Sequence, residues 1–312
     1  MPHFVVLDDR GILAVSGPDC RAFLQGLISN DVTQVSAAEA RYGALLTAQG
    51  RYLHDFIIAD SGAALWLDAE RARLPDLQRR LSIYRLRAKI ALDARLDLAV
   101  AAVFGEGALT VFGLPDEPGA ARPFAGGVVL VDPRLAALGA RAILPEAEAR
   151  PALAALGLAE SDFAAYDRRR LALGVPDGSR DLIADKSLLL ESGFDELHGV
   201  DWHKGCYIGQ ELTARTKYRG LVKRRLFPVR IDGPLPAPGT PVTAEGREVG
   251  EMRSSRDGLG LALLRIEAVG ESRRLMAGEA VILPAPPEWM RLSDDAPHPA
   301  GRGEGETREA GG

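Results

Sequence analysis

The stretch Lys204-Gly-Cys-Tyr-Ile-Gly-Gln-Glu211 contains Cys206, one of two cysteines in a chain of 312 residues. Glycines stand directly before the thiol and three residues after it, so the backbone there can approach a ligand closely. Lys204 and His203 lie shortly before the thiol, and positive neighbours favour the thiolate, which is the nucleophile and the metal ligand. A buried, apolar cysteine in a turn is the alternative, and spacing alone leaves both interpretations open.

The rest of the chain contains few residues that could form a disulfide or a metal site with this thiol. The second cysteine is Cys20, and the sequence contains no Cys-x-x-Cys pair and no Cys/His cluster at metal-ligand spacing. Neither a disulfide framework nor a closed zinc site can be built from these residues. Any cysteine chemistry must therefore come from a single thiol, and we expect no permanently bound metal.

Outward from this stretch, the first two thirds of the chain mix strand and helix patterns. The predicted strands cover residues 5–7, 11–16, 42–47, 52–59, 64–67 and 89–92. Helical spacing of apolar residues follows Pro18 as far as Ile28 and recurs over 69–86 and 134–175. Strands followed by helices in this order predict an α+β fold with helices on one face of a sheet.

The composition changes after residue 225. The run Phe227-Pro-Val-Arg-Ile-Asp-Gly-Pro-Leu-Pro-Ala-Pro-Gly-Thr-Pro-Val242 alternates short apolar segments with Gly/Pro turns, which is typical of a small β-barrel. We therefore predict an α+β region over 1–225 and a C-terminal β-barrel domain over 226–290. In 291–312 small and polar residues prevail, so we predict a disordered tail there.

Some partners and compartments are disfavoured by the same sequence. No apolar stretch reaches the roughly 20 residues that a membrane helix requires, and the first residues lack the basic and apolar segments of a secretory signal. The formal net charge is −5 and no nucleic-acid-binding module is evident. We therefore expect a cytoplasmic protein that binds neither membranes nor nucleic acid.

The stretch 204–211 resembles the signature of the YgfZ family of folate-binding iron–sulfur cluster maintenance factors and of its mitochondrial assembly relatives. Other segments resemble that family in the same order, namely Phe23–Val32, Ala48–Phe56, Tyr84–Ile90 and the residues after the signature. The family is similar in fold to the T-protein of the glycine cleavage system. The resemblance, which covers residues 5–285, therefore implies two intertwined ferredoxin-like α+β subdomains around a central channel, with a small C-terminal β-barrel.

The chain departs from the T-protein at one motif. The T-protein pattern Arg-Leu-Glu-x-Gly, whose Glu holds the pterin, appears here as Arg170-Leu-Ala172-Leu-Gly174, so the carboxylate is missing. The resemblance thus implies a folate-shaped pocket with different chemistry, or none, at its mouth. It implies an accessory factor that binds tetrahydrofolate or another folate and presents Cys206 at the rim of the channel. Its role would be the assembly or repair of iron–sulfur clusters, [4Fe–4S] clusters in particular.

One thiolate cannot hold a cluster, because clusters usually take four cysteine ligands. Cys206 would then act transiently with an iron–sulfur enzyme or an assembly protein, or by thiol exchange. Two rival functions stay open: a folate-dependent aminomethyl or one-carbon transferase of the T-protein type, and a folate-independent thiol-redox regulatory protein. The sequence leaves open whether the protein is an enzyme.

Other candidate site residues follow from the resemblance. Asp55 falls where T-proteins carry an aspartate proposed to act on the folate amine; the alternative is a strand-end Asp that caps a turn beside His54. Asn30 and Asp31 are interpreted as capping and turning the chain after the first helix. The folate or partner contacts that the resemblance implies are Lys204, Gly205, Tyr207, Gly209, Gln210, Glu211, Arg215 and Arg219.

Basic residues gather in two tracts of this acidic chain. The first comprises Arg215, Lys217, Arg219, Lys223, Arg224 and Arg225, and the second comprises Arg85, Arg87 and Lys89. A solvated face is one interpretation of each tract. The other is an anion site, for the polyglutamate tail of a folate or for an acidic partner protein. Trp202, close to the first tract, is interpreted as a packing anchor.

Overall fold

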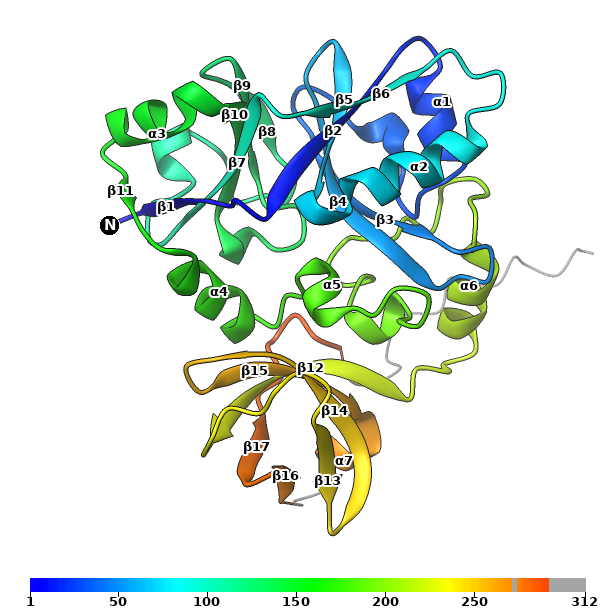
Figure 1. Ribbon diagram of the computed structural model, residues 1–312, viewed down its shortest axis with the longest axis vertical. Coiled ribbons are helices and arrows are strands. Elements are labelled where there is room, and N and C mark those ends of the chain that lie inside the picture. The colour runs from blue at the N-terminus through cyan, green and yellow to red at the C-terminus, as the bar shows by residue number, and fades with distance from the viewer. Residues whose placement is uncertain (271–273, 292–312) are drawn as a thin grey trace, which may run out of the picture.

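The computed structural model describes residues 1–270 and 274–291 (Figure 1). Residues 292–312, which make up nearly all of the predicted tail, lie outside the described residues. In the part of the chain that the structure describes, no helix is long and apolar enough to cross a membrane.

Eleven strands and six α-helices precede the barrel. The strands are β1 (His3–Val6), β2 (Arg10–Ser16), β3 (Arg41–Leu46), β4 (Tyr52–Asp60), β5 (Ala64–Glu70), β6 (Ala91–Arg95), β7 (Leu98–Phe104), β8 (Ala121–Phe124), β9 (Gly127–Val131), β10 (Ala140–Pro145) and β11 (Ala159–Glu160). The helices are α1 (Cys20–Gln25), α2 (Leu74–Tyr84), α3 (Glu146–Ala155), α4 (Phe163–Ala172), α5 (Gly178–Asp181) and α6 (Gln210–Tyr218).

A five-stranded antiparallel sheet has the order β3-β4-β5-β2-β6. Side chains alternate between its two faces, because successive residues of a strand point to opposite sides. Leu13 and Val15 of β2 therefore join the core beneath α1 and α2, whereas Ile12 and Ala14 join the core on the other face. Helix α2 contributes Leu74, Leu77 and Leu81 to the first of these cores, at helical spacing.

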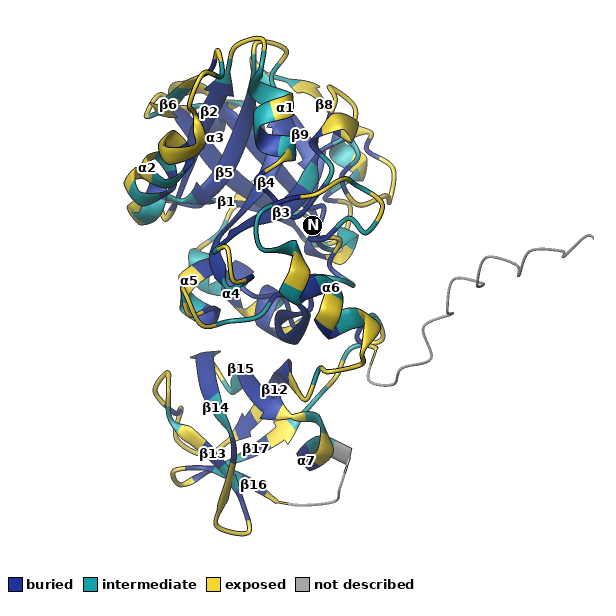
Figure 2. Cartoon of the chain, turned by 90° about the vertical axis from the view of Figure 1, so that its right-hand side faces the viewer, coloured by how far each residue is buried: buried dark blue, intermediate teal, exposed yellow. Residues whose placement is uncertain are grey.

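A second, six-stranded sheet has the order β11-β1-β7-β10-β9-β8. Its strand β7 is buried on both faces: Ala101 and Val103 pack toward α3, and Val100 and Ala102 pack toward the five-stranded sheet. The inner faces of the two sheets thus share one core, with helices on both outer faces. Figure 2 shows the strands of both sheets largely buried.

The first two strands belong to different sheets. Strand β1 pairs with β7 and β11, while β2 pairs with β5 and β6. The chain crosses between the sheets at residues 7–9, where the Leu7 amide donates to Val100 and the Arg10 amide donates to the carbonyl of Leu7. The sequence predicts both strands but not their partners, because strand pairing depends on residues far away in the chain.

Helical spacing misled the prediction for 134–175. Residues 140–145 form β10, which lies between β7 and β9 in the six-stranded sheet. A short apolar run that is buried on both faces cannot be told from a buried helix by periodicity alone. Strands β7, β8 and β9 were not predicted either; β7 reads Leu-Ala-Val-Ala-Ala-Val-Phe, the continuous apolar run of a strand buried on both faces.

The remaining strands close a six-stranded barrel of order β12-β15-β14-β13-β16-β17, which lies below the two sheets in Figure 1. Its elements are β12 (Arg224–Asp232), β13 (Pro241–Ala244), β14 (Arg247–Arg256), β15 (Leu259–Arg265), α7 (Ile266–Gly270), β16 (Leu275–Ala277) and β17 (Ala280–Pro284). Closure removes exposed strand edges, and the interior is filled by apolar side chains such as Phe227, Val242 and Met252. The predicted division at residue 225 stays a prediction.

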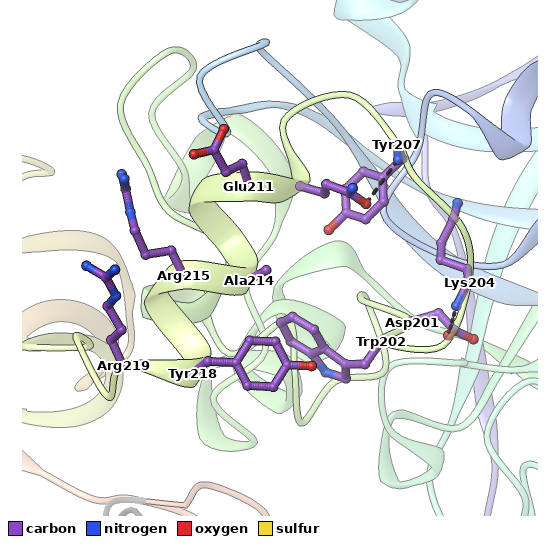
Figure 3. A pocket seen from close by; sticks show the side chains of 10 residues that line it. Asp201, Trp202, Lys204, Tyr207, Glu211, Ala214, Arg215, Tyr218 and Arg219 are labelled. Carbon is purple, nitrogen blue, oxygen red and sulfur yellow. Dashed lines mark hydrogen bonds between the residues drawn. The ribbon is translucent and has the colours of Figure 1, made fainter. Parts of the chain in front are cut away.

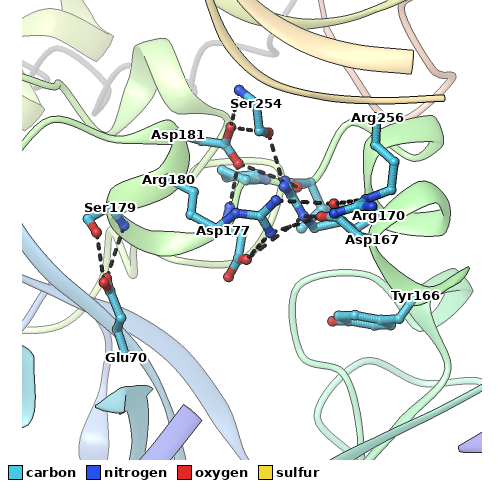
Figure 4. A network of polar contacts seen from close by, with 12 residues as sticks. Glu70, Tyr166, Asp167, Arg170, Asp177, Ser179, Arg180, Asp181, Ser254 and Arg256 are labelled. Carbon is cyan, nitrogen blue, oxygen red and sulfur yellow. Dashed lines mark hydrogen bonds and ion pairs between the residues drawn. The ribbon is translucent and has the colours of Figure 1, made fainter. Parts of the chain in front are cut away.

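A buried polar network joins the barrel to α4 and α5 (Figure 4). Arg170 of α4 is fully buried, and its guanidinium donates to Asp167, Asp181 and the Ser254 hydroxyl of β14 at 2.6–3.0 Å. Arg256 of β14 also donates to Asp167, at 2.6 Å. Each buried charge thus has an opposite charge in hydrogen-bonding contact, which offsets its loss of hydration.

Candidate functional site

Residues 204–209 form the loop before α6, which begins at Gln210, and this loop lies directly on the turn between β3 and β4. Gly209 adopts φ 81°, and a Cβ there would lie 2.4 Å from the Thr47 carbonyl oxygen. Gly50 of the turn adopts φ 80°, and its Cβ would lie 2.7 Å from the Gly209 carbonyl oxygen. Both positions therefore require glycine, for the backbone conformation and for the close approach.

Side chains also hold this loop. The Asp201 carboxylate accepts hydrogen bonds from the His203 and Lys204 amides at 2.7 and 2.9 Å. The Gln210 side chain accepts one from the Tyr207 amide at 3.2 Å. These contacts turn the backbone around Cys206 without involving the thiol.

Lys204 points back into the protein. Its ammonium donates to the Ile28 and Asn30 carbonyl oxygens, at 2.7 Å each, and lies 5.2 Å from the centre of the Tyr207 ring. Burial lowers the pKa of Lys204 to about 8 and raises that of Tyr207 to about 12. The ammonium therefore fastens the loop to the segment after α1, and is not the free positive neighbour of the thiol that the sequence suggested.

The two cysteines have different surroundings. Cys206 is exposed, so the alternative of a buried cysteine in a turn is wrong. Cys20, at the start of α1, is half-buried and packs against the core under that helix. Among the described residues, no group of three or more His, Cys, Asp or Glu side chains could hold a metal ion. A metal cluster on Cys206 would need ligands from a second molecule.

A pocket of 560 Å³ opens between α6 and the loop that carries Cys206 (Figure 3); Lys204 and Tyr207 of that loop line it, but Cys206 itself does not. It is lined by Asp201, Trp202, Lys204, Tyr207, Gln210, Glu211, Ala214, Arg215, Tyr218 and Arg219. Six of the eight expected folate or partner contacts are in this lining; Gly205 and Gly209 are not. Glu211, Arg215 and Arg219 follow one another at intervals of four residues and so lie on one face of α6.

Four lining residues were not predicted as site residues. Ala214 and Tyr218 share a face of α6 at the same four-residue interval, so helical spacing could have found them. Trp202 donates from its indole nitrogen to Asp195 at 2.6 Å and stands edge-on to Tyr218, with ring centres 6.2 Å apart. Trp202 thus packs as predicted and also forms a wall of the pocket.

The first basic tract divides into paired and unpaired cations. Lys217 pairs with Asp195 at 2.8 Å, Arg224 with Glu191 at 3.4 Å, and Arg225 with Glu196 at 2.8 Å. Arg215, Arg219 and Lys223 are exposed and form no ion pair with a described residue. The charge available to an anion beside the pocket therefore comes from Arg215 and Arg219.

Asp55 lies elsewhere. It is the fourth residue of β4, is only 5% exposed, and accepts hydrogen bonds from the Tyr42 and Tyr52 hydroxyls at 3.0 and 2.7 Å. Burial, together with the Asp55 carboxylate, raises the pKa of both tyrosines, so both hydroxyls keep the proton that they donate. The alternative of an Asp at a strand end is wrong, and Asp55 is not part of the pocket lining.

Asn30 and Asp31 turn the chain, as predicted. The Asp31 carboxylate caps the 3-10 helix Val32–Gln34 by accepting from the Thr33 amide at 2.9 Å. The Asn30 side-chain amide donates to the carbonyl oxygens of Tyr42 and His198, at 2.6 Å each. Both residues fix the segment to which Lys204 is fastened.

Comparison with solved structures gives the class of fold. The structure matches that of the glycine cleavage system aminomethyltransferase T from Bartonella henselae, with a TM-score of 0.74 over 94% of this chain and 86% of that chain, at 17% sequence identity. A likeness at this identity concerns the fold alone. The predicted fold class, T-protein-like α+β with a small C-terminal β-barrel, is confirmed.

Sequence comparisons then give the family. Residues 223–292 match the model of the CAF17 C-terminal β-barrel domain. The mitochondrial iron–sulfur cluster assembly factor IBA57 of Homo sapiens is 36% identical over 308 residues, covering 91% of this chain and 84% of the human protein. That of Mus musculus is 34% identical over 306 residues, with the same coverage. The chain belongs to the IBA57 family of iron–sulfur cluster assembly factors, which confirms the resemblance to YgfZ-type proteins.

The expectation of a cytoplasmic protein is wrong. The relatives from Homo sapiens and Mus musculus are both named mitochondrial proteins. The expectation rested on the lack of long apolar segments, which argues only against secretion and membrane insertion. Mitochondrial targeting segments are amphipathic and rich in arginine, so apolar length does not reveal them.

Proposed function

We propose that this protein is an accessory factor for the assembly or repair of iron–sulfur clusters, [4Fe–4S] clusters in particular, and that Cys206 is its functional thiol. One observation carries the proposal: in a member of the IBA57 family, the exposed cysteine lies in a loop that is held by contacts of Asp201, Lys204 and Gly209, and this loop borders a pocket of 560 Å³. The second cysteine packs against the core and is poorly placed for a partner.

The cluster is cargo in this proposal. Cys206 supplies one sulfur ligand, and an iron–sulfur enzyme or an assembly protein supplies the others, because clusters take four ligands. Alternatively, the thiolate attacks a partner disulfide, which forms a mixed disulfide and releases one partner thiolate. A partner thiolate then attacks the partner sulfur of the mixed disulfide and releases Cys206, so that no net oxidation occurs. In both cases the loop must present its thiol outward, and the contacts of Asp201, Lys204 and Gly209 support that presentation.

Tetrahydrofolate or another folate is the proposed ligand of the pocket. The volume lies within the roughly 300–1,000 Å³ that is usual for such ligands, and Trp202, Tyr207 and Tyr218 offer ring faces and edges for a pterin. Arg215 and Arg219 can pair with the glutamate carboxylates. A bound tetrahydrofolate would supply the N5 and N10 amines that carry one-carbon units.

Two observations weigh against the rival aminomethyltransferase. Position 172 carries alanine and lines a separate pocket of 220 Å³ next to the barrel. Both oxygens of the Asp55 carboxylate already accept hydrogen bonds from tyrosines. If the purified protein releases formaldehyde or ammonia from an aminomethyl donor with tetrahydrofolate, and Asp55→Asn abolishes that turnover, the rival replaces the proposal.

The decisive test replaces each cysteine separately. In cells that lack the protein, we expect the wild type and Cys20→Ser to restore the activity of a [4Fe–4S] enzyme, and Cys206→Ser to fail at equal abundance. Serine removes the soft sulfur ligand while leaving a side chain of similar size. Full rescue by Cys206→Ser would show that the thiol is dispensable and remove the basis of the proposal.

A binding experiment separates the folate part from the thiol part. With 5-formyltetrahydrofolate in equilibrium dialysis, we expect Arg215→Gln/Arg219→Gln to bind about tenfold more weakly, because two exposed charge contacts contribute up to about 1 kcal/mol each. The matched control is Arg230→Gln/Arg247→Gln on the barrel, where both arginines are exposed. No binding by the wild type, combined with fast labelling of Cys206 at neutral pH, would favour the folate-independent redox protein.

A further inference from the structure

The C-terminal end of α2 and the loop that follows it expose large apolar side chains. Ile83, Tyr84 and Leu86 are 62%, 40% and 90% exposed. Leu86 has φ 43°, a conformation that leucine seldom adopts. Single exposed apolar residues are common on protein surfaces, but three within four residues form a patch that fits a partner.

Unpaired cations alternate with these side chains. Arg85, Arg87 and Lys89 are exposed, and none forms an ion pair with a described residue. In α2 itself, Arg79 and Arg80 both pair with Asp76. The sequence has no acid between Asp76 and Asp93. The Asp19 carboxylate reaches the loop from elsewhere in the chain and accepts from the Lys89 backbone amide at 2.7 Å, so one acid lies near three cations and the loop keeps a net positive charge.

A hollow lies beside the loop. It has a volume of 200 Å³ and is lined by Leu45, Leu46, Thr47, Ala48, Leu53, Arg80, Ile83 and Tyr84. Leu46 and Thr47 are also the residues against which Gly209 packs. The hollow and the loop that carries Cys206 therefore share the same β3–β4 turn as a wall.

We propose that residues 83–89 and this hollow form a docking surface for an acidic segment of a partner protein, with one apolar side chain of that segment in the hollow. The unpaired cations can form ion pairs with carboxylates of the partner, and the hollow has room for one of its apolar side chains. A lipid bilayer supplies anionic charge but no side chain to fill a hollow with defined walls, which favours a protein. The inference rests on the proposed function only for the idea that this partner donates or receives the cluster.

The test uses polymers of known chemistry. We expect the full chain to bind labelled poly(Glu,Tyr) more tightly than poly-Glu in fluorescence anisotropy, because only the former offers an apolar group. Arg85→Glu/Arg87→Glu should weaken binding of both polymers by about tenfold or more. Leu86→Ser/Ile83→Ser should weaken only poly(Glu,Tyr). Matched controls on the barrel are Arg230→Glu/Arg247→Glu and Leu235→Ser, whose residues are likewise exposed.

Four results would overturn the proposal: equal losses in the barrel variants, no preference for poly(Glu,Tyr), loop-dependent binding to phosphatidylglycerol vesicles without polymer binding, or loop-dependent self-association of the chain. Unchanged circular dichroism and thermal unfolding of the variants exclude misfolding as the cause. Cys206→Ser should bind poly(Glu,Tyr) like the wild type. The docking surface and the proposed function can therefore fail independently, because the polymer assay needs no thiol and the rescue assay needs no polymer.

Discussion

At the scale of single residues, the two cysteines differ in burial, and the lysine of the motif points into the protein. Cys20 packs against the core, whereas Cys206 faces solvent. Lys204 lies two residues before Cys206 in the sequence, yet its ammonium reaches carbonyl oxygens of residues 28 and 30. Sequence distance alone did not predict the direction of that side chain.

The sign of the Lys204 effect on stability follows from its pKa. Folding lowers this pKa from an ordinary value of about 10.4 to about 8, through burial. Below about pH 8 the charged form is present in both states and its desolvation opposes folding. Between about pH 8 and 10 the folded state binds fewer protons than the unfolded state, so this group makes stability rise with pH.

Amine labelling can check the lowered pKa of Lys204. We expect its reaction with trace acetic anhydride, followed by mass spectrometry of the peptide, to titrate near pH 8 in the folded protein. In denaturant the same lysine should titrate near the ordinary value of about 10.4, because burial is lost. Equal midpoints in the two states would contradict the burial that the structure assigns to this ammonium.

At the scale of elements, two glycines decide how the motif loop meets the sheet. Gly209 and Gly50 both have left-handed backbone conformations and touch each other across the β3–β4 turn. The sequence shows both glycines in segments that resemble a known family. Only the structure shows that they are partners in one contact, because they are far apart in the chain.

Replacing Gly209 by alanine should therefore destabilise the protein strongly. We expect Gly209→Ala to lower the free energy of unfolding by about 2–4 kcal/mol, because the left-handed conformation and the clash with the Thr47 carbonyl both oppose a Cβ. Gly62→Ala is the matched control: Gly62 has the same φ of 81°, and no atom lies within 4 Å of its added Cβ. Its loss should be about 1 kcal/mol, from backbone conformation alone.

Urea unfolding of both variants measures the difference. If the two glycine variants lost equal stability, close packing of the loop on the turn would be refuted.

Helices and strands with one buried face can be predicted from the spacing of their apolar residues. Amphipathic α2 and the strands of the five-stranded sheet were predicted, whereas β10 was mistaken for helix because burial on both faces erases its alternation.

At the scale of the whole molecule, the Arg170 network joins the barrel to the α+β region. The guanidinium is buried among Asp167 and Asp181, and it also donates to Ser254 of the barrel. Removing one partner of a buried charge network leaves carboxylates without compensation. Loss of this one guanidinium should therefore weaken the whole contact between the barrel and the α+β region.

Arg170→Met should lower the free energy of unfolding by about 3 kcal/mol or more. Arg168→Met, on the same helix, should change it by no more than about 0.5 kcal/mol, because Arg168 is 53% exposed and its distance to Asp257 is 3.7 Å. Urea titration followed by tryptophan fluorescence measures both. Similar small effects of the two substitutions would mean that the network does not hold the barrel.

The sequence by itself determined the family and the fold class, because short motifs and local patterns do not depend on distant contacts. Through the family resemblance it also indicated six residues that line the pocket, of which Lys204 and Tyr207 lie in the loop before α6 and the others in α6 or directly after it. Only the tertiary structure decided which cysteine is exposed and where Lys204 points. It also decided that Asp55 lies apart from the pocket, and that Ile83 and Tyr84 line a hollow whose wall includes the β3–β4 turn on which the motif loop packs. These outcomes depend on burial and on contacts between residues far apart in the chain, which no local pattern encodes.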